Sequence, residues 1–233
     1  MSANLTIYRI GEQGEPVAVI DDYVRDPAAL RAQALKADYA PAGHHYPGHR
    51  ARAPAAYLEE RGDLLRQVLT EIFAMQAGAR VVECSYSIVT VPPDRLTPIQ
   101  RLPHFDGVEP NRIAVLHYLS GPEFGGTSFY RHRATGFETV TAARYETYSA
   151  ALREDVRRHG LPPARYHSGT SEMFEQTGTI DAAFNRLVIY RGNRLHSGNI
   201  LRPHALGPAP DEARLSVNTF LWLNDPAGLH RAG

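Results

Sequence analysis

Two distant segments of the chain carry residues that could bind a metal ion together. The first, Arg101-Leu102-Pro103-His104-Phe105-Asp106-Gly107, places a histidine and a carboxylate two positions apart, and His196 follows much later. Because residues i and i+2 of a β-strand point to the same side, His104 and Asp106 can face one cavity. Two histidines and one carboxylate on one face of an octahedron leave three positions free, which suits ferrous iron. We therefore predict a mononuclear non-haem iron site at His104, Asp106 and His196.

A second pattern follows His196 and strengthens this interpretation. Arg214-Leu215-Ser216 opens a β-rich segment, and its arginine and serine share a face of the expected strand. A guanidinium can bind a carboxylate through two parallel hydrogen bonds, and a neighbouring hydroxyl can add another. Arg202 is an alternative for the same role, but it lacks the accompanying serine. We expect Arg214 and Ser216 to bind a carboxylate.

The order of these motifs resembles that of the Fe(II)- and 2-oxoglutarate-dependent dioxygenase superfamily. The resemblance covers roughly residues 81–224 and is closest to the prolyl-hydroxylase-like branch, in a poorly characterised bacterial subgroup. The intervals from Asp106 to His196 and from His196 to Arg214 are longer than is usual there. The other segments that carry the resemblance are Val115-Leu116-His117-Tyr118-Leu119, Phe124-Gly125-Gly126-Thr127-Ser128-Phe129-Tyr130, Asn185-Arg186-Leu187-Val188-Ile189-Tyr190 and the run from Arg214 to Trp222.

The resemblance implies cofactors and a reaction. His104, Asp106 and His196 would bind Fe(II), and Arg214 with Ser216 would bind the distal carboxylate of the co-substrate 2-oxoglutarate, which Tyr130 could also reach. With O2, 2-oxoglutarate would give succinate and CO2 while a substrate C–H bond is oxidised by hydroxylation, desaturation or ring closure. A carboxylate at position 106 argues against halogenation, since related halogenases have a small residue there. The implied substrate is a small amino-acid-like molecule, a peptide or a carrier-linked group.

Four further residues are candidates for contacting the substrate. Arg101 directly precedes the metal segment. His117 and Tyr118 are neighbours on one expected strand, so one of them points into the barrel; the alternative for His117 is a hydrogen-bonded position in the core. Arg131 could bind a substrate carboxylate or lie at a solvated strand end.

Short strands and a few helices must position these residues. Asp26-Pro27 predicts the start of one helix, an apolar stripe from Leu58 to Phe73 a second, and residues 140–158 a third. Runs of β-branched and aromatic residues bounded by glycine and proline predict strands at residues 16–20, 81–91, 112–119, 126–131, 185–190 and 214–222.

These elements predict a mainly β fold with flanking helices, in which a double-stranded β-helix (a jelly-roll or cupin-like core) is supported by N-terminal helices. We expect a single domain over residues 1–233, with the support in 1–80, the core in 81–224 and an insertion at about 137–183. The insertion and a loop at 40–54, rich in glycine, proline and histidine, are expected to decide which substrates are admitted, as a lid or a wall of the site. The alternative that they are surface segments without such a role stays open.

Composition narrows the class of partner. Lys plus Arg and Asp plus Glu number 25 each, so charge gives no indication of a nucleic-acid or membrane partner. Cys84 is the only cysteine, which excludes an internal disulfide and a thiolate cluster. We find no signal-peptide pattern and no apolar run of the roughly 18 residues that span a bilayer. We expect a cytoplasmic protein whose partner is its substrate; the oligomeric state stays open, a homodimer included.

Three other functions remain open on sequence alone. The same ligands could serve a cupin-like metalloenzyme that does not use 2-oxoglutarate, or a zinc-dependent hydrolase. The histidines could also be structural in a non-catalytic jelly-roll binding module. Arg214-x-Ser216 favours use of 2-oxoglutarate, and loss of metal on substitution of His104 would separate a metal site from a structural histidine.

Overall fold

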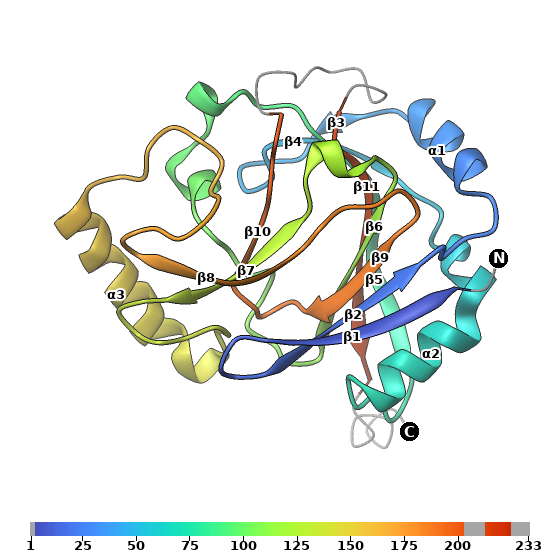
Figure 1. The fold of residues 1–233 in the computed structure, drawn as a ribbon, viewed down its shortest axis with the longest axis horizontal. Coiled ribbons are helices and arrows are strands. Elements are labelled where there is room, and N and C mark those ends of the chain that lie inside the picture. The colour runs from blue at the N-terminus through green and yellow to red at the C-terminus, as the bar shows by residue number, and fades with distance from the viewer. Residues whose placement is uncertain (1–2, 203–212, 225–233) are drawn as a thin grey trace, which may run out of the picture.

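The computed structural model describes residues 3–202 and 213–224, and two antiparallel β-sheets form its centre (Figure 1). The larger sheet has the strand order β1-β2-β9-β6-β11-β5-β4-β3, and the smaller has the order β10-β7-β8. The strands of the larger sheet are β1 (Asn4–Ile10), β2 (Glu15–Asp21), β3 (Ala40–Pro41), β4 (Gly48–Arg52), β5 (Ala79–Val89), β6 (Arg112–Tyr118), β9 (Leu187–Arg191) and β11 (Leu215–Leu223). Those of the smaller sheet are β7 (Thr127–His132), β8 (Phe174–Ile180) and β10 (His196–Gly198).

Strand β6 shows how a sequence period of two creates two packed faces. Ile113 and Val115 lie in the hydrophobic core on one side of the larger sheet, whereas Ala114 and Leu116 lie in a second cluster on the other side. That second cluster includes Phe129 of the smaller sheet, so the two sheets pack face to face. Both faces of β6 are therefore buried, which explains its continuous apolar sequence.

The segment that contains His104 extends the smaller sheet by one more extended stretch. It forms an antiparallel bridge with β10, in which the backbone N–H of His104 donates to the carbonyl of His196 (2.9 Å) and the N–H of His196 donates back (2.8 Å). In the larger sheet, β2, β6 and β9 contribute buried residues that pack against Phe129 of β7 and Ile180 of β8. This arrangement confirms the predicted mainly β, jelly-roll core.

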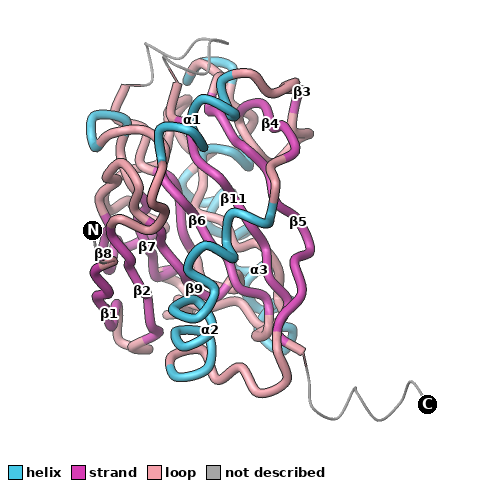
Figure 2. Tube along the Cα trace, turned by 90° about the vertical axis from the view of Figure 1, so that its right-hand side faces the viewer, coloured by secondary structure: helices cyan, strands magenta, loops and turns pink. Residues whose placement is uncertain are grey.

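Two helices, α1 (Pro27–Leu35) and α2 (Gly62–Glu71), cover the outer face of the larger sheet (Figure 2). Asp26 caps α1 as predicted, because its Oδ1 accepts a hydrogen bond from the N–H of Ala29 at 2.9 Å. Helix α2 follows the 3-10 turn η1 (Ala55–Arg61) and packs Val68 and Leu69 against the sheet. The predicted support by N-terminal helices is confirmed. Shorter 3-10 turns are η2 (Pro93–Arg95), η3 (Pro98–Arg101) and η4 (Pro122–Phe124).

The third helix, α3 (Ala142–His159), lies in the predicted insertion and covers the outer face of the smaller sheet. Its Tyr148 packs in a cluster with Tyr130 of β7 and Phe174 of β8. Strand β8 is part of the insertion and lies outside the predicted strands. Only Phe174 and Ile180, at its two ends, are buried, so its sequence lacks the alternation of apolar residues that predicts a strand. None of the described helices is long and apolar enough to cross a membrane.

Candidate active site

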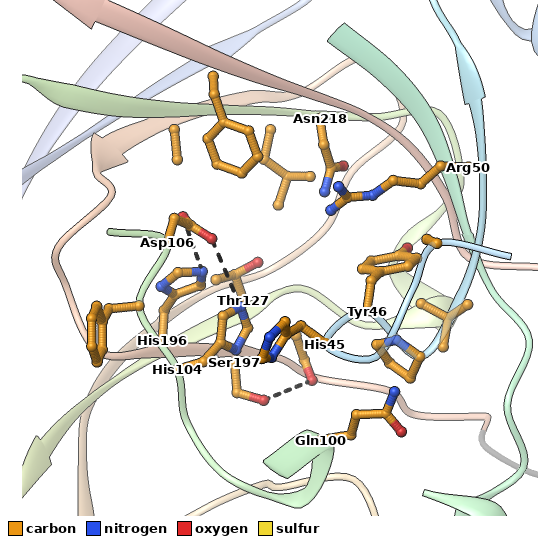
Figure 3. Close-up of a pocket in the computed structure, with 18 of the residues that line it drawn as sticks. His45, Tyr46, Arg50, Gln100, His104, Asp106, Thr127, His196, Ser197 and Asn218 are labelled. Atoms are coloured by element: carbon orange, nitrogen blue, oxygen red, sulfur yellow. Dashed lines mark hydrogen bonds and ion pairs between the residues drawn. The ribbon is translucent and has the colours of Figure 1, made fainter. Parts of the chain in front are cut away.

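The structure brings His104, Asp106 and His196 together. Their ligand atoms all lie within 4.8 Å of one another. Asp106 Oδ1 lies 4.0 Å from Nε2 of His104, and Asp106 Oδ2 lies 3.7 Å from Nε2 of His196, so the carboxylate faces both imidazoles (Figure 3). The two imidazole ring centroids are 4.4 Å apart. Residues far apart in the sequence thus form one compact set of three ligands.

Backbone hydrogen bonds hold these side chains in place. His104 and His196 occupy the bridge between the metal segment and β10 described above. The backbone N–H of Asp106 donates to the carbonyl of Gly192, which directly follows β9, at 2.7 Å, and this bond anchors the backbone that carries the carboxylate. Between them, Phe105 packs its ring against Tyr148 of α3. The predicted His-x-Asp segment is therefore secured on both sides.

Hydrogen bonding and burial prepare the imidazoles as neutral ligands. Nδ1 of His196 donates to the carbonyl of Arg194 at 2.8 Å, which leaves Nε2 unprotonated and directed at Asp106. Burial lowers the pKa of His196 to about 4. The surrounding protein and the neighbouring His196 also lower the pKa of His104, although its side chain remains 52% exposed at the cavity. Both imidazoles are therefore neutral near neutral pH, which is the form that binds metal ions.

The Asp106 carboxylate provides the test of whether a metal ion fits. Its Oδ2 is buried and has no hydrogen-bond partner in the described part of the chain. Burial raises the pKa of Asp106, because a buried carboxylate without a partner is costly. The lone pair of His196 Nε2 also faces this carboxylate, so a cation between them would satisfy both groups. The donor set of two imidazoles and one carboxylate fits Fe(II).

A cavity of about 510 Å³ opens beside the three ligands (Figure 3). This volume lies in the range of roughly 300–1,000 Å³ that is typical of small-molecule sites. The polar residues that line it are His45, Tyr46, Arg50, Gln100, His104, Asp106, Arg112, Thr127, Tyr166, Tyr190, His196, Ser197, Arg214, Asn218 and Thr219.

Arg214 lines this cavity, and two backbone carbonyls orient its guanidinium. Nε donates to the carbonyl of Gly125 (3.2 Å) and Nη2 to that of Gly126 (3.0 Å), while Cζ lies 5.3 Å from the centre of the Tyr118 ring. These two bonds use Nε and Nη2, so Nη1 is the nitrogen that the two carbonyls leave over. Gly125 has φ +85°, and a Cβ there would collide with the carbonyl oxygen of Asn199. Glycine is therefore required where the loop supports Arg214.

The other two residues considered for binding a carboxylate are placed differently. Ser216 shares the cavity-facing side of β11 with Arg214, but it is fully buried and its Oγ donates to Oδ1 of Asn218 at 2.8 Å. Asn218, not Ser216, reaches the cavity wall. Arg202 lies over the ring of Phe124 and does not line the cavity. The structure thus favours Arg214 over Arg202 and corrects the direct role expected of Ser216.

The roles expected of Tyr130 and Arg131 are also corrected. The ring of Tyr130 packs against His167 with centroids 4.8 Å apart, in the cluster beneath α3, and does not reach the cavity. Arg131 forms ion pairs with Glu12 and Glu175 at the outer side of β7. Tyr130 is thus not part of the described cavity wall, and Arg131 is paired with two carboxylates.

None of the three remaining substrate candidates reaches the cavity. His117 faces the helices, where it is fully buried, stacks on Tyr57 and hydrogen bonds through Nε2 to Oδ1 of Asn185 (3.1 Å). The core alternative for His117 is therefore the one observed. Tyr118 points to the opposite side, but its hydroxyl is bonded to that of Thr127 (2.8 Å) and its ring supports Arg214.

Arg101 has a structural position as well. Its guanidinium donates to the carbonyls of Leu96 and Pro162, so it joins the segment before His104 to the insertion. It lines a separate, smaller cavity and not the one beside the metal ligands. The expected contact of Arg101 with the substrate is thus not supported.

Two cavity residues, Tyr46 and Arg50, lie outside the predicted site. Both come from the 40–54 segment, which contains β3 and β4 and forms one wall of the cavity. The expected border position of this segment is thus observed, and its cluster of aromatic and basic residues was the available signal. The insertion contributes Tyr166 to the wall, whereas α3 lies against the outer face of the smaller sheet.

Comparisons with solved structures give similarities at low sequence identity. HygX from Streptomyces hygroscopicus, with nickel and 2-oxoglutarate bound, is 13% identical with a TM-score of 0.49, over 88% of this chain and 82% of that one. AviO1 from Streptomyces viridochromogenes Tue57 is 13% identical with a TM-score of 0.47, over 91% of each chain. An oxidoreductase of the 2OG-Fe(II) oxygenase family from Burkholderia pseudomallei is 11% identical with a TM-score of 0.45, over 89% of this chain and 84% of that one.

Sequence comparisons identify the family without identifying an activity. A comparison with curated proteins gives no match. A family model matches residues 1–221, which is nearly the whole chain. The chain therefore belongs to the family of unknown function DUF6445.

Proposed function

We propose that the chain is an Fe(II)- and 2-oxoglutarate-dependent oxygenase that oxidises a C–H bond of a small amino-acid-like, peptide or carrier-linked substrate. The observation that carries the proposal is one cavity with two kinds of site on its wall. The neutral imidazoles of His104 and His196 meet the unpartnered carboxylate of Asp106, and the guanidinium of Arg214 lines the same space. A metal ion and a carboxylate-bearing co-substrate can thus bind side by side.

Each of these residues has a distinct task in the proposed reaction. His104, Asp106 and His196 would hold Fe(II), which when bound supplies redox chemistry with O2. Nη1 of Arg214 would donate to the distal carboxylate of 2-oxoglutarate, because Nε and Nη2 are held by Gly125 and Gly126. This orientation precedes binding, so little conformational freedom is lost when the carboxylate binds.

Tyr46 supports the charged wall of the cavity. Its side chain lines the cavity, and burial raises the pKa of its hydroxyl against the opposing charges of Arg214 and Arg50. The hydroxyl has almost no accessible surface, so the ring is the part of Tyr46 that serves the site. The ring centre lies 4.6 Å from Cζ of Arg50 and holds that guanidinium in place.

Apolar side chains keep water away from the reacting centre. Leu102, Leu116 and Phe220 line the cavity, and the ring of Tyr190 packs against His196 with centroids 4.9 Å apart. A wall of this kind strengthens the electrostatic contacts inside the site and limits side reactions with water.

Anaerobic addition of Fe(II) and 2-oxoglutarate tests the proposal. The wild-type protein should develop a weak visible charge-transfer band, and metal analysis should show that His104→Ala binds no Fe(II). Arg214→Gln should bind the metal but need at least tenfold more 2-oxoglutarate to develop the band, whereas Arg202→Gln should match the wild type. A metal-loaded wild type without the band would contradict the proposal, and a cupin-like enzyme would bind metal without responding to 2-oxoglutarate.

The substrate can then be sought by its effect on co-substrate turnover. Release of succinate would be measured with a panel of free amino acids, short peptides and carrier-linked residues. A true substrate should raise the rate above the uncoupled background and should itself be oxidised, which mass spectrometry would detect. Stimulation that persists in Asp106→Ala would not arise from this site.

A further inference from the structure

Arg50 brings a second guanidinium into the cavity, separate from that of Arg214. It lies on β4, where its backbone is paired with Ser87 of β5, and its side chain extends toward Asn218 (Figure 3). Nη1 of Arg50 forms an ion pair with Glu83 at 2.9 Å, and Cζ lies 4.6 Å from the centre of the Tyr46 ring. The ion pair and the stacked ring hold the guanidinium in one orientation.

Nη2 of Arg50 is the nitrogen left to serve the cavity. Nη1 pairs with Glu83, and Nε has almost no accessible surface, whereas Nη2 has no hydrogen-bond partner among the described residues. A donor without a partner gains a hydrogen bond when an acceptor binds there. A carboxylate oxygen is such an acceptor, and the charge of the guanidinium strengthens the bond.

Asn218 supplies a further donor beside this guanidinium. Its Oδ1 already accepts a hydrogen bond from Oγ of Ser216 at 2.8 Å, so its amide NH2 group is the part left to serve the cavity. Ser216 thus has an indirect role, since it sets the orientation of the Asn218 amide. Arg50 and Asn218 together present donors and no acceptor, which selects an anionic group.

The charges around the cavity indicate that this anion is additional to 2-oxoglutarate. A divalent metal ion and Arg214 would balance Asp106 and the two carboxylates of the co-substrate. Arg50 is paired with Glu83, but Arg112 also lines the cavity, lies over the ring of Phe220 and forms no ion pair among the described residues. The carboxylate of Glu109 lies close to Arg112, since both would meet a Cβ placed on Gly107. The guanidiniums of Arg50 and Arg112 nevertheless keep this wall of the cavity positive enough to attract a further anionic group.

We propose that Arg50 and Asn218 bind a carboxylate of the substrate, so that the substrate is a small molecule with a free carboxylic acid group. This inference rests on the proposed function, which places the metal and 2-oxoglutarate in the same cavity. It narrows the substrate class, because an amino acid linked to a carrier through its carboxyl group has no free carboxylate to offer. The cavity of about 510 Å³, shared with the co-substrate, also suits a small acid.

Acetate, with acetamide as its neutral counterpart, is the probe for this site. The protein is labelled with nitrogen-15 arginine and loaded with Zn(II) and 2-oxoglutarate, and the Nε–H signal of Arg50 is identified by its loss in Arg50→Gln. Acetate should shift this signal in a saturable way, whereas acetamide should not. Arg52→Gln, which removes an exposed arginine of the same strand, should keep the response.

Several results would overturn the carboxylate site. Equal shifts with acetate and acetamide would do so, as would shifts of the Arg50 and Arg52 signals of equal size. If 2-oxoglutarate alone moved the Arg50 signal and blocked acetate, Arg50 would belong to the co-substrate site. If 2-oxoglutarate failed to bind but acetate still shifted Arg50, the proposed function would be contradicted while the carboxylate site was supported.

The succinate assay then tests the substrate class itself. The compound of the panel that releases succinate fastest should carry a free carboxylate. Conversion of that carboxylate to a primary amide should lower the rate at least tenfold, and Arg50→Gln should remove the difference between acid and amide while 2-oxoglutarate affinity is kept. A best substrate without a carboxylate, or one whose amide reacts equally fast, would overturn the proposal.

Discussion

Substitution of His117 by phenylalanine should make the unfolding free energy less sensitive to acid. His117 is fully buried, and this burial lowers its pKa to about 4. In the unfolded chain its pKa returns to about 6.5. Between these values the unfolded state binds more protons than the folded state, so stability falls as the pH falls. When the pH is lowered from about 7.5 to about 5, His117 alone should lower the unfolding free energy by about 2 kcal/mol.

The phenylalanine variant isolates this contribution. Its ring can keep the stacking on Tyr57, and Oδ1 of Asn185 still accepts a hydrogen bond from the N–H of Val24 at 3.0 Å. The substitution also removes the buried Nδ1 of His117, which has no partner among the described residues. At about pH 7.5 we therefore expect the unfolding free energies of the wild type and the phenylalanine variant to differ by about 1 kcal/mol or less.

Urea unfolding at several pH values, in the presence of a chelator, would measure the effect. Other buried histidines, including His196 and His167, contribute with the same sign in both proteins, because burial lowers the pKa of each to about 4. The difference between variant and wild type therefore reports His117. If that difference were independent of pH, the His117 ring would be accessible to water, as a substrate contact would be, and its assignment to the core would be wrong.

Three further substitutions should have separable effects. Asp106→Ala should reduce bound Fe(II) at least tenfold in metal analysis while the melting temperature of the metal-free protein stays close to that of the wild type, since the carboxylate has no other partner. Gly125→Ala should lower the urea-unfolding free energy by about 2 kcal/mol or more, because of its positive φ and the collision with Asn199. Arg194→Met should lower the unfolding free energy by about 3 kcal/mol in the same assay, because it deprives the carbonyls of Ile10 and Glu15 of a buried donor. The exposed Arg80 should tolerate the same change.

The sequence was sufficient to predict the residues whose environment is determined by strand alternation and spacing. His104 and Asp106 share a side because they are two apart in an extended segment. Arg214, which directly precedes β11, also reaches the cavity. The cap at Asp26 and the helix near residues 140–158 are local features, so they also follow from local sequence. Tertiary contacts were not needed for any of these.

The surroundings of the residues that were assigned incorrectly are set by which element packs on each face of a sheet, and the local sequence does not show this. His117 and Tyr118 alternate as expected, but only the packing of α1 and α2 decides which side is the core. Tyr130 lies next to Phe129 in the sequence, and it faces outward because the insertion supplies a cluster there that no periodicity reveals. Arg50 enters the cavity only because β4 pairs with β5, a contact between segments far apart in the chain.

The reciprocal backbone bonds between His104 and His196 have a consequence for how such a site can change during evolution. These two ligands are joined through their main chains, so neither can shift without the other, whereas Asp106 is attached to the framework through one backbone bond to Gly192. The backbone positions of the two histidines are therefore coupled to each other, whereas the side chain at position 106 can be changed without breaking those bonds. If Asp106 holds the metal as proposed, a small residue at this position would open one coordination position while the backbone bonds between the two histidines stay in place.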